Sequence, residues 1–278
     1  MSRKIYLPVV LLVLFTLLLG ACSPAPVVEP VVEEPTAVVV EEPVVEPTEA
    51  PVVVEAPDFQ ALFTEIIGNT GKEKSYSTMP ADALNTALIE NPDLFVIDVR
   101  EPSELEENGH VPGAVNIPVK TLADNLALLP ADLDEEIVVY CKSGTRSTFA
   151  WTILNMLGYT NVRNMTAGMD GWIKAELPVE EGLAPAEEIS TPIVENEALY
   201  LAVKDFANNP PEGWASVKNT DVNEMLINGE EFVLIDARRA DEYEAGYVDP
   251  AVNIPLEEVM ARLDEIDPST KAVVYCKS

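Results

Sequence analysis

The stretch that decides the fold is IVVYCKSGTRS, residues 137–147. Residues 137–140 form a short apolar run, which is the pattern of a buried strand in a parallel sheet. Polar residues follow this run, and a helix is expected from about Ser147. Because ligand sites in open α/β sheets lie at the carboxyl ends of the strands, the loop that begins at Cys141 is the first candidate for a functional site.

The composition of this loop favours an anion cradle around a reactive sulfur. Gly144 gives the backbone the freedom for a tight curl, in which successive N–H groups can point at one spot. Lys142 and Arg146 add positive charge, and the following helix adds the positive end of its dipole. A thiolate at Cys141 would be stabilised there and would attack electrophilic sulfur well. A lone buried cysteine is usually inert packing, but this loop favours the nucleophile.

Around the loop, apolar runs alternate with helical segments. Strands are expected at residues 94–99, 115–117, 137–140 and 162–165, and helices at 81–90, 101–108, 122–129, 147–157 and 171–175. Such alternation predicts an α/β fold with a parallel sheet and right-handed crossover connections.

The same pattern returns later in the chain. Residues 94–100, 114–118 and 137–143 are matched in order and spacing by residues 232–238, 251–255 and 272–278. A helix is expected before each unit, near residues 59–67 and 195–206. The period is far longer than the ~20–50 residues of a solenoid repeat, so it indicates tandem domains.

Further motifs make a resemblance specific. They read Asp-Val-Arg-Glu at residues 98–101, Gly-His-Val-Pro-Gly-Ala-Val-Asn-Ile-Pro at 109–118, Leu-Gly-Tyr at 157–159 and Gly-Met-Asp-Gly-Trp at 168–172. Together with the Cys141 loop, and in this order, these motifs resemble a rhodanese domain throughout residues 77–178.

The resemblance implies a three-layer α/β fold around a five-stranded parallel sheet, and it implies sulfur transfer. Cys141 would accept a sulfane sulfur from a small anionic donor such as thiosulfate, carry it as a persulfide, and pass it to a thiol or to cyanide. No cofactor is implied. The implied cradle consists of Lys142, Ser143, Gly144, Thr145 and Arg146, with Arg146 closing it and Arg100 near its rim.

The spacing within the loop separates sulfur chemistry from phosphate chemistry. Four residues lie between Cys141 and Arg146. Cysteine phosphatases of similar topology have five, because a phosphate needs a wider cradle, so the shorter loop favours sulfur.

Neighbouring polar residues are interpreted as structural. An ionised thiolate needs no base, so Asp98 is expected to accept hydrogen bonds in a turn, and His110 to have a structural role. The chain has three cysteines, a single histidine and no CxxC pair. This pattern indicates neither a zinc site nor a disulfide framework.

The second unit stops matching at residues 276–278, before the glycine, arginine, helix and last strand of the pattern. Tyr247 stands where the first unit has His110. We therefore expect one complete domain plus an incomplete copy, in a chain that is a fragment of a longer protein. No catalysis is assigned to Cys276, and the second unit is not expected to unfold cooperatively, because a missing inner strand would leave backbone groups unpaired.

The amino terminus has the features of an export signal. Arg3 and Lys4 precede an apolar run at residues 5–19, and small residues lead to Cys22. This resembles the lipobox of bacterial lipoproteins, which implies removal of residues 1–21 and a diacylglyceryl group on Cys22. An uncleaved transmembrane anchor is the alternative, although the run is near the short limit for spanning. In either case the rest of the chain is expected outside the cytoplasm, attached to a bacterial membrane.

Composition shifts set the remaining boundaries. Residues 22–57 are rich in Pro, Val and Glu, which predicts a disordered tether. The first domain is placed at residues 58–178 with its core at 77–178, a linker at 179–192 and the second copy at 193–278. The net charge of −31 argues against binding to nucleic acid, because the phosphates would be repelled.

Three functions remain open on the sequence alone. The first is an extracytoplasmic sulfurtransferase of the thiosulfate type, and the second is a membrane-tethered binding module. The third is a persulfide carrier without independent turnover. The intact Cys141 loop favours the enzyme over the binding module, but it does not separate the enzyme from the carrier.

Overall fold

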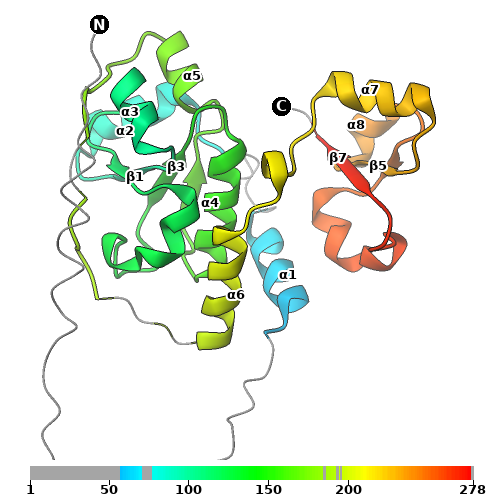
Figure 1. The fold of residues 1–278 in the computed structure, drawn as a ribbon, viewed down its shortest axis with the longest axis horizontal. Coiled ribbons are helices and arrows are strands. Elements are labelled where there is room, and N and C mark those ends of the chain that lie inside the picture. Colours follow the sequence, from blue (N-terminus) through cyan, green and yellow to red (C-terminus); the bar gives the residue numbers. More distant parts are fainter. Residues whose placement is uncertain (1–56, 71–76, 184–185, 192–193, 195, 277–278) are drawn as a thin grey trace, which may run out of the picture. The chain divides into compact units, whose positions relative to one another are not determined.

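The computed structural model describes residues 57–70, 77–183, 186–191, 194 and 196–276 (Figure 1). The expected export signal, the lipid site at Cys22 and the tether as far as residue 56 lie outside this described part. Inside it, none of the helices has the length and the apolar character that crossing a bilayer requires.

The first sheet has four parallel strands in the order β2-β1-β3-β4. The strands are β1 (Phe95–Asp98), β2 (Val115–Asn116), β3 (Ile137–Tyr140) and β4 (Val162–Asn164). The central strand β3 pairs with β1 on one side and with β4 on the other, in the registers Phe95↔Ile137 and Ile137↔Val162. This parallel order confirms the predicted α/β class.

The fifth strand implied by the resemblance is a single parallel bridge, between Thr78 and Asn164 at the edge of β4. Met79 N–H donates to the Asn164 carbonyl at 2.9 Å, and then the chain reaches Pro80. Proline has no N–H to donate, and the next helix begins directly after it at Ala81. In the described residues the pairing on this edge therefore extends no further.

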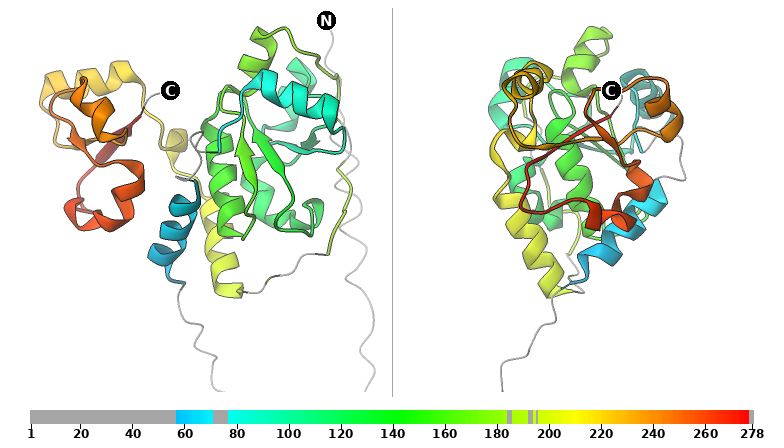
Figure 2. Two further views of the ribbon diagram at one scale, coloured as in Figure 1. Left: turned by 180° about the vertical axis from the view of Figure 1, so that it is seen from behind. Right: turned by 90° about the vertical axis from the view of Figure 1, so that its right-hand side faces the viewer.

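Side chains of the central strands alternate between two cores, as the strand period requires. Ile97 and Val139 lie in one core, whereas Val96 and Val138 lie in the other. The first core is covered by helix α4 (Thr145–Met156) and by the 3-10 turn η1 (Val119–Asp124), and the second by α2 (Ala81–Glu90) and α5 (Gly168–Lys174). Figure 2 shows α4 running beside the strands of this sheet. The arrangement has the three layers that were predicted.

The remaining helical segments of this part include one difference from the sequence prediction. They are α1 (Phe59–Thr70), α3 (Pro102–Asn108) and η2 (Leu126–Leu128). Residues 122–129 were expected to form one α-helix, but the structure has two 3-10 turns there, η1 ending at Asp124 and η2 spanning Leu126–Leu128. Asn125 separates the turns with φ −114° and ψ 38°, and its side-chain amide donates to the Thr121 carbonyl at 2.7 Å. This local hydrogen bond competes with a continuous helix.

The second sheet has three parallel strands in the order β6-β5-β7, which follow the pattern of the first. They are β5 (Val233–Asp236), β6 (Val252–Asn253) and β7 (Ala272–Tyr275). The accompanying segments are α7 (Asn219–Asn228), α8 (Ala240–Glu244), η3 (Glu212–Ala215), η4 (Leu256–Ala261) and η5 (Leu263–Glu265). The core of this part is small. One cluster holds the buried residues Met225, Leu234, Ala251 and Val273, and Ile235 and Ile254 are buried as well.

Helix α6 (Glu197–Asn208) precedes the second sheet in sequence but packs on the first core. Val203 and Ala207 are buried there, and the Phe206 ring stacks on Phe149 of α4 with centroids 5.5 Å apart. Tyr200 adds a hydrogen bond from its hydroxyl to the Ala123 carbonyl at 3.2 Å. The helix thus belongs to the layer that supports α4.

Candidate active site

Cys141 follows the last residue of β3, where the central strand reaches the carboxyl edge of the sheet. Every residue of β3 is buried, and Cys141 itself is 1% exposed. Lys142 and Ser143 after it are exposed, and Gly144 is buried again. The chain therefore comes to the surface for two residues and returns over the sulfur.

The predicted curl of the loop is confirmed at Gly144. Its φ is +101°, and its N–H points back to Cys141, with 3.2 Å between the nitrogen and Sγ. A Cβ at this position would lie 2.4 Å from the carbonyl oxygen of Thr166. The position thus requires glycine both for its dihedral angle and for space.

The carbonyl of Gly144 is held by the first turn of α4. Ser147 Oγ donates to it at 2.9 Å, and Thr148 donates from its N–H at 3.0 Å and from Oγ1 at 2.9 Å. Asn164 of β4 donates in turn to Thr148 Oγ1 at 3.1 Å. With its carbonyl fixed in this way, Gly144 is held in the orientation that aims its N–H at the sulfur.

The other end of the loop is fixed by the start of α5. Met169 N–H donates to the Cys141 carbonyl at 2.8 Å, and Asp170 N–H donates to the Lys142 carbonyl at 3.0 Å. Gly168 allows this approach, because a Cβ there would lie 2.4 Å from the Lys142 oxygen. Sequence reasoning gave these residues no role at the site. The Gly-Met-Asp-Gly-Trp motif was the available signal.

The two cations of the loop have different surroundings. Lys142 is exposed, whereas Arg146 forms a two-point ion pair with Glu104 of α3, at 2.5 Å (Nη1 to Oε2) and 2.8 Å (Nη2 to Oε1). The hydrogen bond from Arg146 lowers the pKa of Glu104, and the same bond raises the pKa of Arg146. Glu104 was not predicted from the sequence, because it lies far from the loop along the chain.

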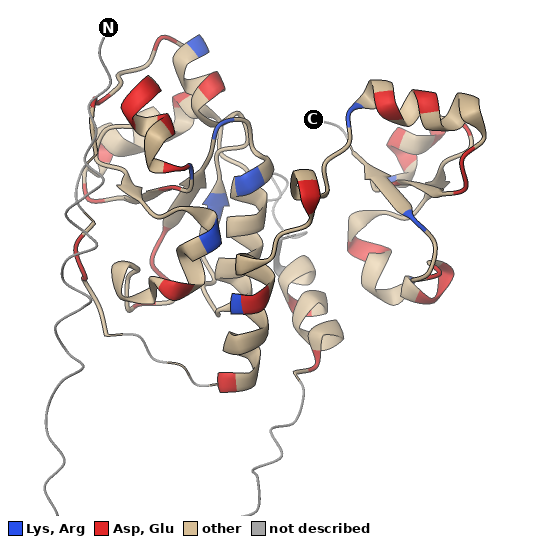
Figure 3. Cartoon of the chain, viewed as in Figure 1, with Lys and Arg blue, Asp and Glu red and all other residues tan. Residues whose placement is uncertain are grey.

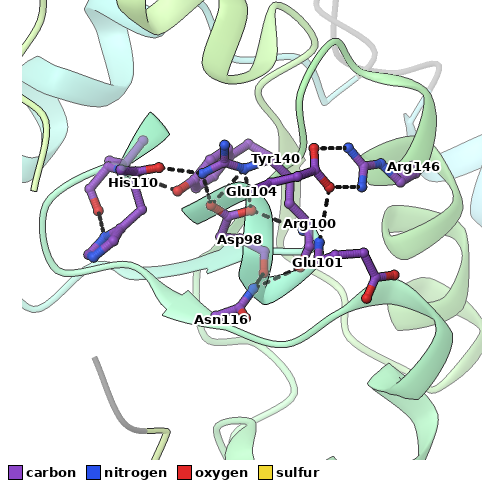
Figure 4. A network of polar contacts seen from close by, with 10 residues as sticks. Asp98, Arg100, Glu101, Glu104, His110, Asn116, Tyr140 and Arg146 are labelled. Atoms are coloured by element: carbon purple, nitrogen blue, oxygen red, sulfur yellow. Dashed lines mark hydrogen bonds and ion pairs between the residues drawn. The ribbon is translucent and has the colours of Figure 1, made fainter. Parts of the chain in front are cut away.

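The prediction that Arg100 lies near the rim of the cradle is wrong. Its side chain is 2% exposed and forms a two-point pair with Asp98, with Nη2 2.6 Å from Oδ2 and Nε 3.0 Å from Oδ1. Nη2 also donates to the Gly109 carbonyl at 2.7 Å, and the guanidinium lies over the Tyr140 ring (Figure 4). A cation whose buried donors are already satisfied in this way is part of the scaffold.

The structural roles predicted for Asp98 and His110 agree with their contacts. Asp98 is fully buried and accepts hydrogen bonds from the N–H and the side chain of Arg100. His110 is also buried, its backbone pairs with Glu180 in both directions at 2.9 Å, and its Nδ1 lies 2.9 Å from the Val111 carbonyl oxygen. Among the described residues, neither side chain forms a hydrogen bond or an ion pair with Cys141. No cluster of metal-ligating side chains occurs in this part of the chain either.

The fold and the loop define a class: a parallel α/β domain with a cysteine-centred cradle at the carboxyl edge of its central strand. A family model for the rhodanese-like domain matches residues 81–175 and 218–278, which together make up more than half of the chain. The chain therefore belongs to the rhodanese-like domain family.

Several proteins similar to this chain are named as sulfurtransferases. A sulfurtransferase of Allochromatium vinosum is 31% identical over 99 residues, which are 36% of this chain and 90% of the relative. Thiosulfate sulfurtransferase PspE of Escherichia coli is 41% identical over 68 residues, 24% of this chain and 64% of that protein. The 3-mercaptopyruvate sulfurtransferase of Escherichia coli is 28% identical over 225 residues, 64% of this chain and 73% of that protein. These similarities support a transferase of the rhodanese type.

Proposed function

We propose that the chain is an extracytoplasmic sulfurtransferase that moves a sulfane sulfur from a thiosulfate-like donor to a thiol or cyanide, through a persulfide on Cys141. The observation that carries the proposal is the Gly144 N–H, 3.2 Å from Cys141 Sγ in a loop held at both ends. The thiolate is the form of a cysteine that attacks sulfur. In this geometry the Gly144 N–H can donate a hydrogen bond to the sulfur during the attack.

The first half-reaction consumes the donor. The Cys141 thiolate attacks the outer sulfur of thiosulfate, and a new S–S bond forms. The S–S bond of the donor breaks, and sulfite leaves with the electron pair. Cys141 then carries the persulfide, Cys–S–S⁻.

The second half-reaction restores the enzyme. The acceptor, RS⁻ or CN⁻, attacks the outer sulfur of the persulfide, and the S–S bond breaks with its electron pair returning to Cys141. The products are RSS⁻ or SCN⁻ and the original thiolate. Charge and electrons balance in both steps without a cofactor.

The surroundings of Cys141 fit both halves. The N-terminus of α4, a helix of 12 residues, begins directly behind the loop at Thr145 and contributes a positive dipole end. Lys142 and Ser143 are exposed, so a donor anion from solvent can reach the loop at these two residues. The low exposure of the sulfur limits access to small molecules or to an acceptor thiol presented at the loop.

The test is an intact-mass measurement of the full chain after exposure to thiosulfate. We expect a gain of one sulfur atom that cyanide removes, that is absent in Cys141→Ser and that persists in Cys276→Ser. Absence of the gain in a folded, reduced wild-type chain would refute the thiosulfate reaction. A stable gain that no thiol or cyanide removes would favour the carrier instead.

The proposed location depends on Cys22. We propose that Cys22 carries a diacylglyceryl group after removal of residues 1–21, which anchors the chain to the outside of a bacterial membrane. The test is expression in a bacterium with a labelled fatty acid. We expect label in the wild type and none in Cys22→Ser. An unlabelled wild-type chain that retains residues 1–21 would favour the uncleaved anchor.

A further inference from the structure

Arg146, the arginine of the active-site loop, does not have its terminal nitrogens free to bind a sulfur-donor anion. Both Nη1 and Nη2 of Arg146 bind the carboxylate of Glu104, at 2.5 Å and 2.8 Å. A two-point pair of this kind is the strongest and most directional that an arginine forms. A donor anion that needs Arg146 must therefore compete with a carboxylate that is already in place.

Glu104 also changes the charge that a donor meets. Lys142 and Arg146 are the two cations of the loop, and Glu104 cancels one of them formally. Glu106 and Glu107 are exposed on the same helix, α3, and Asp170 is exposed on α5. Figure 3 shows acidic positions in red on both of these helices. With a net charge of −31 on the whole chain, a dianion arrives at a site with little positive charge to receive it.

The negative charge of Glu104 is not required to cap its own helix. Glu104 is the third residue of α3 and accepts a hydrogen bond from Glu101 N–H at 3.1 Å. A glutamine at this place in a capping box accepts the same bond. The pair with Arg146 is also part-exposed, at 17% for Arg146 and 25% for Glu104, so water screens part of its contribution to stability. The effect of the charge is thus concentrated at the loop.

We propose that Glu104 is a specificity-determining residue that makes the Cys141 site prefer monoanionic sulfane-sulfur donors, such as thiosulfonates and organic persulfides, over the dianion thiosulfate. The inference rests on the proposed sulfur transfer and narrows its donor class. Glu104 acts through Arg146, whose pKa is raised by the pair and also by the nearby Cys141 sulfur. The chemistry is unchanged: with a thiosulfonate, RSO₂S⁻, the thiolate takes the outer sulfur and the sulfinate RSO₂⁻ leaves with the electron pair.

The test compares two donors that differ by one charge, thiosulfate and methanethiosulfonate, on the full chain. In Glu104→Gln we expect kcat/KM to rise about tenfold for thiosulfate and about threefold for methanethiosulfonate, because the Coulomb energy scales with the charge of the donor. The ratio of the two values should therefore rise about threefold. Added salt should reduce the gain, since it screens the charges.

A matched control is available on the same helix. Glu107→Gln removes an equal charge from α3. Among the described residues, the Glu107 side chain forms no hydrogen bond or ion pair with Arg146. We expect its donor ratio to stay within about twofold of the wild type, since exposed, distant charges are screened. A ratio unchanged in Glu104→Gln, or shifted equally in Glu107→Gln, overturns the inference.

A second variant covers the case in which Glu104→Gln does not fold. Arg146→Gln leaves Glu104 unpaired beside the loop, so the thiosulfate to methanethiosulfonate ratio should fall about threefold or more; an unchanged ratio overturns the inference. If wild-type Cys141 takes sulfur from neither donor, the proposed function and this inference fail together. If it takes sulfur and the ratios do not move, only this inference fails.

Discussion

Strands β3 and β7 have almost the same sequence, yet they occupy very different environments. Val139 of β3 is fully buried, whereas Val274 at the matching place in β7 is 61% exposed. Cys141 is buried, and Cys276 is exposed. The strand β3 lies between β1 and β4 under α4, while β7 is an edge strand of the described part of the second sheet. Burial of the cysteine is therefore decided by the neighbouring elements and not by the strand that leads to it.

Both sheets contain an ion pair between an aspartate at the end of a strand and the arginine two residues later. Asp236 and Arg238 repeat the pair of Asp98 and Arg100, with the same 2.6 Å distance, and Arg238 donates to the Gly246 carbonyl at 2.7 Å. The pair forms in the second sheet although Cys276 there is exposed. It is thus a connection within the scaffold that does not depend on a finished cysteine loop.

The largest expected effect is the loss of that pair in the first sheet. Arg100→Met should destabilise the first sheet by about 3–5 kcal/mol, because the negative charge of Asp98 would stay buried without a partner. Arg238 is 19% exposed, so Arg238→Met should destabilise the second sheet less than Arg100→Met destabilises the first. Denaturant melts followed by tryptophan fluorescence report the first sheet, and amide exchange in β5 reports the second. Equal losses would contradict the difference in burial.

The next effect concerns the loop. Gly144→Ala should lower the stability by about 2–4 kcal/mol, because a left-handed residue and a clash with Thr166 are combined. It should also lower sulfur transfer about a hundredfold or more, because the clash moves the N–H of residue 144 away from the sulfur. Gly229→Ala is the matched control: its φ is +67°, but nothing lies within 4 Å of the added Cβ. This control should cost about 1–2 kcal/mol and leave transfer unchanged, as measured with a cyanide acceptor.

A smaller effect should separate the two matched valines. Val139→Ala removes buried methyl groups and should cost about 2 kcal/mol, whereas Val274→Ala should cost less than about 0.5 kcal/mol. Amide exchange measured strand by strand checks both. A similar cost at the two positions would mean that β7 is covered in solution.

The smallest effect depends on pH. The pKa of Glu104 is lowered from 4.5 by its bond to Arg146, so the pair stabilises the fold fully above 4.5, and the contribution is lost as the pH falls through the lowered value. The size should be below about 1 kcal/mol, because the pair is part-exposed. Melting midpoints from about pH 6 to pH 3 should converge for the wild type and Glu104→Gln at the acid end. A gap that widens towards acid would show the opposite sign.

Local patterns were enough to predict the framework of the site. The expected bounds of α2 and β3 agree with the structure at both ends, and Gly144 has the curled conformation that was predicted. These features depend on neighbours in sequence: an apolar run, a helix start and a glycine. The interpretation of Asp98 as a hydrogen-bond acceptor succeeded for the same reason.

Contacts between distant segments could not be predicted in that way. Arg100 was placed near the rim because the resemblance implied it. The Asp-x-Arg pattern recurs at Asp236 and Arg238, and that recurrence was the available signal for a scaffold pair. Glu104 meets Arg146 from 42 positions away. The 3-10 turns around Asn125 depend on one side-chain hydrogen bond that periodicity does not reveal.

The link between α5 and the loop sets an order of assembly. The amides of Met169 and Asp170 hold the carbonyls of Cys141 and Lys142, so residues made later in synthesis complete the surroundings of a cysteine made earlier. A nascent chain that has reached Cys141 does not yet contain either of these amides. Sulfur chemistry would begin only when the rest of the domain has emerged and docked, which ties reactivity of the cysteine to completion of the fold around it.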